Sequence, residues 1–414
     1  MQVSDLLIAE NAKPKVIMIV PSLSNQDVAA MRDDTPGVGQ LIHFNNAGTG
    51  LALRPSLDAV KEHLDLEATL GGYEAASANS SGMDMFYTSL AALIGSKPHE
   101  IAYIENATRA WDMAFYGIDF REGDRIITGR AEYVSNYVAF LQMKKRKNVE
   151  IDLIEDDANG QIDLAALKAA ITPKTRLVAL THIPTFSGLI NPAEDVGEIA
   201  RSAKLLYLLD ACQSAGQIPL NIGDIGCHML SGTGRKYLRG PRGTGFLYVS
   251  DDVLDQIEPP FIDLQSANWL DDNSYELVPH AMRFETWERY VAGQIGLGVA
   301  VGYAIGYGME RIGNRICALG AQLRTELSAV KGVTLHDKGA RKGGIVTFTV
   351  DGETPAQTQA RLSSAQINVS VSKGTSAQID LPHRGLDSVV RASVHAFNTE
   401  DEIERFVKVL GNLA

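Results

Sequence analysis

Between about residue 100 and residue 250, the chain alternates short apolar runs with stretches of helical character. The apolar runs are IAYI, RIITG, RLVALTHI and LLYLLD, and the helical stretches include RAWDMAFYGI, NYVAFLQMKKRK and VGEIARSAK. This alternation predicts βαβ units, and therefore a mainly parallel sheet with helices on both faces. Ligands of such sheets bind beyond the carboxyl ends of the strands. Candidate functional residues are therefore expected at the ends of the apolar runs.

After about residue 290 the pattern changes. A helical run, AGQIGLGVAVGYAIGYGMERIGNRICALGAQLRTELSAV, is followed by the strand-like GGIVTFTV and VVRASVHAF and by a last helix, DEIERFVKVL. A chain of 414 residues is long enough for two domains. We predict an N-terminal arm packing on the small domain (1–40), a large ligand-binding domain (41–290) and a small α+β C-terminal domain (291–414).

Charge and composition exclude several classes of protein. A net charge of −12 at pH 7 argues against nucleic acid as a partner, because binding to the phosphate backbone needs clustered Lys and Arg. The first residues lack a secretory signal, and VIMIV is too short to span a bilayer, so we expect a cytoplasmic protein with no membrane partner. Cys212, Cys227 and Cys317 have neither zinc-site nor disulfide spacing, so no metal site is expected.

The most informative residues follow two apolar runs. LLYLLD ends in Asp210, which places a carboxylate at the carboxyl end of a strand, although such an Asp can also cap the next turn. In MLSGTGRKYLRGPRGTGFLYV, an apolar run enters a loop of small residues that contains Lys236. Thr233 and the backbone amides near Gly234 are suited to hold a phosphate, and Lys236 is suited to bond an aldehyde on the same ligand.

This block, Asp-x-x-Gln followed by the lysine loop and GPRGTGFLYV, resembles the class V aminotransferases, the NifS-like branch of the fold-type I enzymes that use pyridoxal 5'-phosphate. The resemblance covers roughly residues 40–410. It implies a fold-type I α/β architecture, with a mainly parallel, seven-stranded-type sheet in the large domain and a smaller α+β domain. It also implies pyridoxal 5'-phosphate as cofactor, an α-amino acid as substrate, and a homodimer whose active sites are shared.

The resemblance assigns roles position by position. Lys236 matches the catalytic Schiff-base lysine, Asp210 the catalytic acid that pairs with the pyridine nitrogen, and Arg391 the arginine that binds the substrate carboxylate. The remaining cofactor-binding positions are Ala107, Thr108, Tyr133, Thr185, Gln213, Thr233 and Arg235. Ala47, Gly48 and Tyr73 are candidate substrate-side residues. Tyr73 could equally be a core tyrosine, and Arg391 could pair instead with Glu400 or Glu402.

Three departures from the family pattern bear on the reaction. Cysteine desulfurases carry a loop cysteine near the positions of Thr375 and Ser376, and this chain has no cysteine beyond residue 317. The partner-subunit phosphate turn reads RFETWERY, which leaves open whether Thr286 or Glu288 contacts the partner's phosphate. LGGYEAASANSSG resembles the hercynylcysteine sulfoxide lyase and isopenicillin N epimerase branches more than the desulfurases, and Tyr133 stands where members resembling the lyase have a tyrosine.

From these departures we expect transamination, with β-eliminating C–S lyase or epimerase activity as the alternative. Both act at the α-carbon, where the same carbanion can be reprotonated or can expel a β substituent. Cysteine desulfurase activity is disfavoured, because a thiolate is the required nucleophile and Thr or Ser cannot replace it. A binding or regulatory module without catalysis is a third and weaker possibility, because the lysine, aspartate and arginine are all present.

Overall fold

The computed structural model describes residues 20–411. A seven-stranded sheet forms its centre, in the order β2-β8-β7-β6-β5-β3-β4. Only β8 runs antiparallel to its neighbours. The bounds are β2 (Ile101–Ile104), β3 (Arg125–Gly129), β4 (Glu150–Ile154), β5 (Thr175–Thr181), β6 (Leu206–Asp210), β7 (Met229–Thr233) and β8 (Gly245–Val249). The predicted mainly parallel sheet is confirmed.

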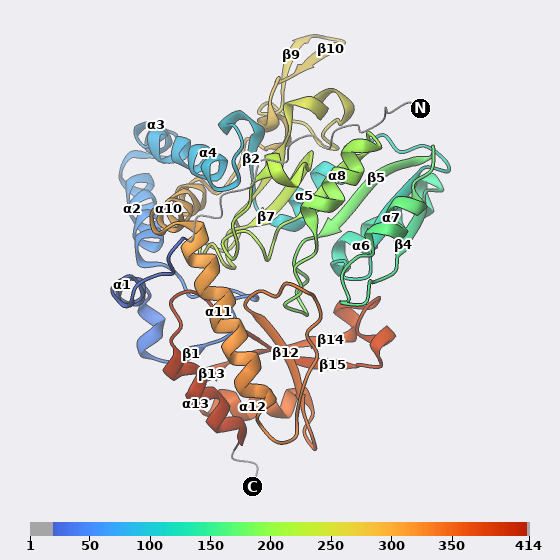
Figure 1. Ribbon diagram of the computed structural model, residues 1–414. Helices are drawn as coiled ribbons and strands as arrows, with labels where there is room; N and C mark the ends of the chain where they lie inside the picture. Colours follow the sequence, from blue (N-terminus) through green and yellow to red (C-terminus); the bar gives the residue numbers. More distant parts are fainter. Residues whose placement is uncertain (1–19, 412–414) are drawn as a thin grey trace, which may run out of the picture.

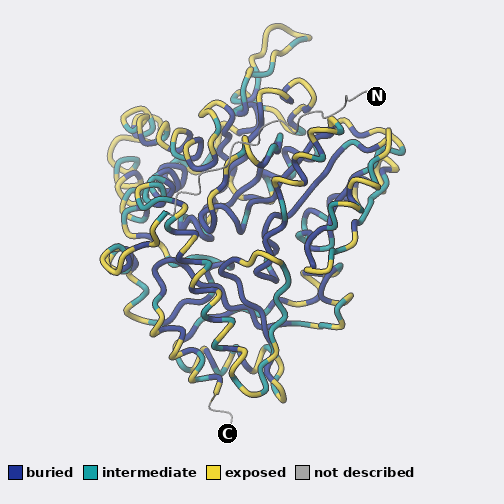
Figure 2. The backbone as a smooth tube through the Cα atoms, viewed as in Figure 1, coloured by how far each residue is buried: buried dark blue, intermediate teal, exposed yellow. Residues whose placement is uncertain are grey.

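Alternating side chains of the central strands face two separate apolar layers. In β6, Tyr207 and Leu209 belong to one buried cluster, and Leu206 and Leu208 belong to the other. Because successive residues of a strand point to opposite faces, a sheet covered on both sides needs apolar residues at nearly every position. This explains the unbroken LLYLL run. Figure 2 shows the central strands as a mostly buried part of the chain.

Helices cover both faces of this sheet (Figure 1). Their bounds in the first part of the chain are α1 (Asn25–Asp33), α2 (Arg54–Leu70), α3 (Gly72–Ala78), α4 (Ser80–Ile94), α5 (Ala107–Tyr116), α6 (Val134–Lys147), α7 (Leu164–Ala170), α8 (Ala193–Ser202) and α9 (Ile222–Ile225). Loop side chains fix where several of them begin. Asn106 accepts a hydrogen bond from the Arg109 amide and caps α5, and Asp163 caps α7 in the same way through Ala166.

A four-stranded antiparallel sheet, ordered β11-β12-β15-β14, forms the lower part of the molecule in Figure 1. It comprises β11 (Val333–Leu335), β12 (Ile345–Val350), β14 (Ser370–Lys373) and β15 (Ser388–Ser393), and it packs with α11 (Met309–Ser328), α12 (Pro355–Ser364) and α13 (Glu400–Gly411). A short parallel pair joins β1 (Ile42–His43) to β13 (Ile367–Asn368). The architecture thus matches the α/β fold with a smaller α+β portion that the sequence predicts.

The long helical run predicted after residue 290 is two helices. α10 (Val291–Tyr307) and α11 meet at an angle of 82°, at Gly308, whose φ of +89° suits glycine. α10 packs on α2 and α4, whereas α11 packs on α13 and β12. No single helix in residues 20–411 is long and apolar enough to cross a bilayer. The domain division at residue 290 stays a prediction.

Part of the predicted N-terminal arm, residues 1–19, lies outside the described residues. In the remainder, Arg32 of α1 donates to Glu402 of α13 at 2.8 Å and to the carbonyl of Phe397 at 3.0 Å. At the opposite end of the molecule, the hairpin of β9 (Ala267–Asp271) and β10 (Ser274–Leu277) projects from the body (Figure 1). Trp269 of this hairpin is 81% exposed.

Candidate active site

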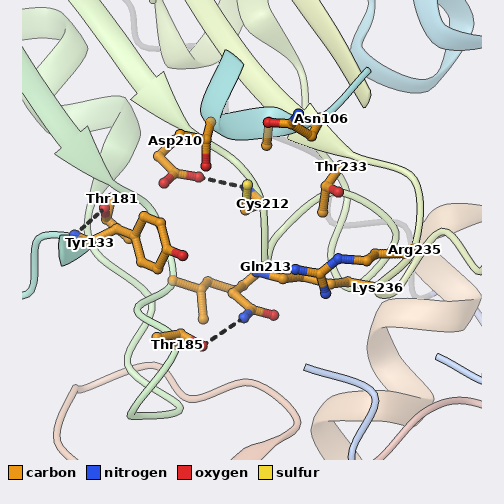
Figure 3. A pocket seen from close by; sticks show the side chains of 13 residues that line it. Asn106, Tyr133, Thr181, Thr185, Asp210, Cys212, Gln213, Thr233, Arg235 and Lys236 are labelled. Atoms are coloured by element: carbon orange, nitrogen blue, oxygen red, sulfur yellow. Dashed lines mark hydrogen bonds between the residues drawn. The ribbon is translucent and has the colours of Figure 1, made fainter. Parts of the chain in front are cut away.

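A cavity opens where β5, β6 and β7 end and α5 begins, which is the edge expected to bind a ligand. Figure 3 shows the side chains that point into it. All nine predicted cofactor-binding residues line the cavity: Ala107, Thr108, Tyr133, Thr185, Asp210, Gln213, Thr233, Arg235 and Lys236. Four further lining residues were missed by the sequence analysis: Asn106, Thr181, Ile183 and Cys212.

Lys236 reaches the cavity from a tightly folded loop after β7. The amide of Gly234 donates to Thr244 at 3.0 Å, and the amide of Gly240 donates to Gly234 at 2.8 Å. A Cβ at Gly234 would lie 2.2 Å from Thr244 Oγ1, so the loop needs glycine there. Lys236 is buried, and burial lowers the pKa of its amine. A lysine in this state can be neutral and act as a nucleophile or base.

Asp210 is the last residue of β6 and is buried at the cavity wall. Its Oδ1 accepts from the Cys212 amide at 2.9 Å, and its Oδ2 accepts from Asn136 Nδ2 at 3.1 Å. Each carboxylate oxygen has two lone pairs, so these bonds orient the group and leave capacity for a donor in the cavity. A protonated ring nitrogen is such a donor.

The first turn of α5 provides an anion site beside Thr233. Asn106 caps this ten-residue helix, and Ala107 and Thr108 follow at its N-terminus, where backbone amides lack partners within the helix. The Thr108 and Thr233 side chains both line the cavity here. The arrangement suits a phosphate group.

Tyr133 and Gln213 approach the cavity from other elements. Tyr133 precedes α6, and its ring points into the cavity in Figure 3. Gln213 Nε2 donates to the carbonyl of Ala47 at 3.0 Å and to Thr185 Oγ1 at 3.1 Å, whereas its buried Oε1 has no partner among the described residues. A buried polar atom without a partner is costly, so a ligand group here would satisfy it.

Arg391 of β15 lies behind Thr185 and is not one of the residues that line the cavity. It donates to Thr185 Oγ1 at 2.7 Å, to the Thr185 carbonyl at 3.0 Å and to Asn45 Oδ1 at 3.0 Å. Its Nε is buried and has no partner among the described residues, and burial lowers the pKa of the guanidinium to about 10. Within residues 20–411 no carboxylate pairs with it, since Glu400 and Glu402 pair with Arg315 and Arg32.

The other substrate-side predictions have mixed outcomes. The carbonyl of Ala47 accepts a hydrogen bond from Gln213, and the carbonyl of Gly48 accepts one from Arg235. Both residues therefore lie at the edge of the site. Tyr73 does not reach the cavity of its own chain. It is 75% exposed, and its ring lies 6.5 Å from that of Trp287, so it is not a core tyrosine either.

The cavity fits pyridoxal 5'-phosphate. It combines a buried amine to bond the aldehyde, a carboxylate for the ring nitrogen, a helix N-terminus for the phosphate and the open Gln213 Oε1. No group of His, Cys, Asp and Glu side chains in the described residues is arranged to hold a metal ion.

Comparison with known proteins identifies the family of this arrangement. The profile of the family described as "Aminotransferase class-V" matches residues 42–406. A probable cysteine desulfurase of Methanothermobacter thermautotrophicus is 27% identical over 391 residues, 93% of this chain and 97% of that protein. The apo structure of the cysteine desulfurase of Thermococcus onnurineus NA1 has a TM-score of 0.88 at 27% identity, covering 95% of this chain and 99% of that one.

A second solved structure, of a C-DES mutant with glycine covalently linked to its PLP cofactor, has a TM-score of 0.84 at 22% identity and covers 92% of this chain and 99% of that one. At that identity the likeness concerns the fold. The family match confirms the predicted fold class and pyridoxal 5'-phosphate as cofactor.

Two expectations from the sequence are wrong. Transamination is not what the relatives indicate, because those of comparable length are named cysteine desulfurases. The expected closer resemblance to the hercynylcysteine sulfoxide lyase and isopenicillin N epimerase branches than to the cysteine desulfurases is also unsupported. The error came from treating the missing loop cysteine as decisive. That cysteine only receives sulfur, whereas the residues that hold the cofactor and activate the substrate are separate from it.

Proposed function

Because the chain belongs to the class-V aminotransferase family, we propose that it uses pyridoxal 5'-phosphate on Lys236 to remove the sulfur atom from L-cysteine and leave alanine. The relatives named cysteine desulfurases support the substrate class. The observation that carries the assignment of residues is a buried lysine and a buried aspartate facing one cavity, with an arginine lacking a carboxylate partner directly behind it.

Each residue has a defined task in this reaction. When bound, the cofactor withdraws electrons from the substrate Cα. Asp210 would accept a hydrogen bond from the ring nitrogen of the cofactor and would keep that nitrogen protonated. Lys236 Nζ would take the proton from Cα, and a lowered pKa favours the neutral amine that this role needs. Arg391 orients Cα through the carboxylate.

The sulfur acceptor is proposed to be a thiol outside the chain, because none of the three cysteines is suited to the task. Cys227 and Cys317 do not line the cavity, and burial raises the pKa of both thiols. Cys212 lines it, but burial and Asp210 raise its pKa. A protonated thiol is a poor nucleophile. The exchange balances: the thiol binds the cysteine sulfur, the Cβ–S bond breaks, and cysteine plus thiol become alanine plus a persulfide.

The segment in which desulfurases carry their cysteine is anchored in this chain. Ala377 and Leu381 are buried against Phe186 and Val389. Asp380 pairs with Arg384 at 2.9 Å and with Lys338 at 3.6 Å, and Lys338 also pairs with Asp156 at 3.0 Å. These contacts hold the segment against Phe186, next to Thr185, and none of its residues lines the cavity, which supports a sulfur acceptor from outside the chain.

A panel of amino acids tests the reaction class. The holoenzyme is incubated with L-cysteine, cystine, L-alanine and L-aspartate, and sulfur release, transfer of the amine to an oxo acid and loss of optical rotation are measured separately. Sulfur release from L-cysteine that depends on an added thiol is expected. Amine transfer without sulfur release would overturn the proposal.

Arg391→Lys is expected to lower kcat/KM for L-cysteine at least about tenfold, or ~1.4 kcal/mol, with the cofactor still bound. Lysine keeps the charge but loses the planar fork that binds a carboxylate through two bonds. Arg315→Lys is a matched control, because Arg315 is also buried but pairs with Glu400 and backbone carbonyls away from the cavity. A lower melting temperature with unchanged kinetics in Arg391→Lys would remove the carboxylate-binding role.

We also propose that the protein is a homodimer. Large apolar side chains are exposed around two adjacent hollows near α3 and α10, namely Tyr73, Phe261, Trp287 and Tyr290. Exposed aromatic clusters of this kind are typical of interfaces. Thr286 and Glu288 line one of these hollows and not the cofactor cavity of their own chain. Both side chains are therefore available for contact with a partner subunit. Sedimentation at micromolar concentration is expected to give a dimer, and a fully active monomer would exclude shared sites.

A further inference from the structure

Glu132 is a buried carboxylate next to the active site that has no role in the steps above. It lies between β3 and α6, immediately before Tyr133. Through residues 20–411, no lysine, arginine or histidine pairs with it. A buried charge without a cation is expensive, so it must be stabilised by hydrogen bonds or serve the site in some way.

Four donors converge on Glu132. Its Oε1 accepts from the Tyr133 amide at 2.8 Å, from Asn136 Nδ2 at 2.8 Å and from the hydroxyl of Thr181, and its Oε2 accepts from Thr128 Oγ1 at 2.9 Å. Such an environment satisfies the ionised form. Burial and the nearby Asp210 oppose it and raise the pKa of Glu132.

Asn136 links this carboxylate to the catalytic one. The same Nδ2 that bonds Glu132 donates to Asp210 Oδ2 at 3.1 Å, and the side chain is buried. The amide has two hydrogens, one for each acid. Two carboxylates thus share one amide, with Asp210 facing the cavity and Glu132 behind it.

We propose that Glu132 is a positioning residue for the cofactor, acting through Asn136 and Tyr133. Asn136 fixes the carboxylate of Asp210, and the bond to the Tyr133 amide fixes the backbone that carries the Tyr133 ring. The negative charge of Glu132 strengthens the hold of Asp210 on the proton of the ring nitrogen. In return, the protonated ring offsets the cost of burying Glu132. This inference rests on the role proposed for Asp210.

Other charged groups near Glu132 have their own partners. Arg130 and Asp156 line a second, small cavity together with Glu132, and they pair with Glu155 and Lys338. The ionisable groups that face the cofactor cavity are Asp210, Cys212, Lys236, Arg235 and Tyr133, with Arg391 behind Thr185. All of these remain unchanged in the variants of Glu132, Glu100 and Asn136 below.

Glu132→Gln tests the proposal, because glutamine keeps the shape and removes the charge. With less negative charge behind Asp210, the protonated form of the bound cofactor is less stable. The pH at which its visible absorbance changes should fall by at least about half a unit, and cofactor affinity should fall at least about fivefold. Absorbance is titrated against pH, and affinity is measured by adding pyridoxal 5'-phosphate to the apoprotein.

Glu100→Gln is the matched control. Glu100 is also buried, and it accepts from the Lys97 amide at 2.9 Å and the Asp251 amide at 3.2 Å, remote from the cavity. The Glu100→Gln substitution also removes one buried carboxylate charge, and it should leave the absorbance profile unchanged. If both variants shift the absorbance profile equally, the shift comes from the change in net charge alone, and the proposal is overturned.

Asn136→Ala provides a second route if Glu132→Gln does not fold. It breaks the shared amide and should shift the profile in the same direction. Wild-type profiles and affinities in the folded variants would overturn the role of Glu132. If Asp210→Asn leaves the profile unchanged as well, the assignment of Asp210 is at fault. If Asp210→Asn alone shifts it, only the role of Glu132 is rejected.

Discussion

Replacement of Lys236 with alanine is expected to lower kcat by at least about a thousandfold and to leave the purified protein without its yellow colour. Lys236 is the lysine that lines the cavity, so its loss removes both the covalent attachment and the base that moves the Cα proton. Borohydride reduction should attach the cofactor permanently to the wild-type protein, and the cofactor should be found on the peptide that contains Lys236.

Lys97→Ala is a suitable control, because Lys97 is an exposed lysine that pairs with Asp251. It should keep its colour and its turnover. Retained turnover in Lys236→Ala, or borohydride labelling of a different lysine, would show that the attachment site is elsewhere.

Asp210→Asn is expected to lower kcat/KM by about 10²–10³-fold while some cofactor remains bound. The amide is close in size to the carboxylate but has no charge, so the ring nitrogen loses its proton and withdraws electrons less strongly. The loops after β6 should hold, because the Cys212 amide can still bond the remaining oxygen. Steady-state kinetics with saturating cofactor provide the measurement.

Near-normal turnover in Asp210→Asn would show that Asp210 only caps the turn after β6. A large loss that accompanies unfolding would be uninformative about catalysis, so the melting temperature is measured on the same sample.

Much of the site could be predicted because parallel strands place their carboxyl ends at one edge. Asp210 ends β6 and Thr233 ends β7, so two apolar runs followed by Asp and by the lysine loop were enough to bring Asp210 and Lys236 together. The central sheet was predictable for a related reason, since strands buried on both faces need nearly continuous apolar sequence.

Contacts between distant segments could not be derived in this way. Asn136 meets Asp210 from 74 positions away, and nothing local marks Glu132 as its partner. Arg391 was expected at the substrate, but its guanidinium donates to Thr185 and Asn45 and does not itself line the cavity. The break at Gly308 was also missed, because glycine recurs throughout that apolar run.

The reaction itself was the largest error of the sequence interpretation. Composition and motif define the cofactor site, but transamination and C–S cleavage diverge only after Cα is deprotonated, so the same residues serve both. The missing loop cysteine describes the fate of the sulfur and does not decide which bond is broken.

The most direct test of the central claim is the ratio of products from L-cysteine in the presence of a small thiol such as dithiothreitol. The proposed function predicts one alanine for each sulfur atom transferred to the thiol, with no protein-bound persulfide and no added oxo acid. Formation of an oxo acid product, with its amine transferred and the sulfur atom still bound to carbon, would contradict it.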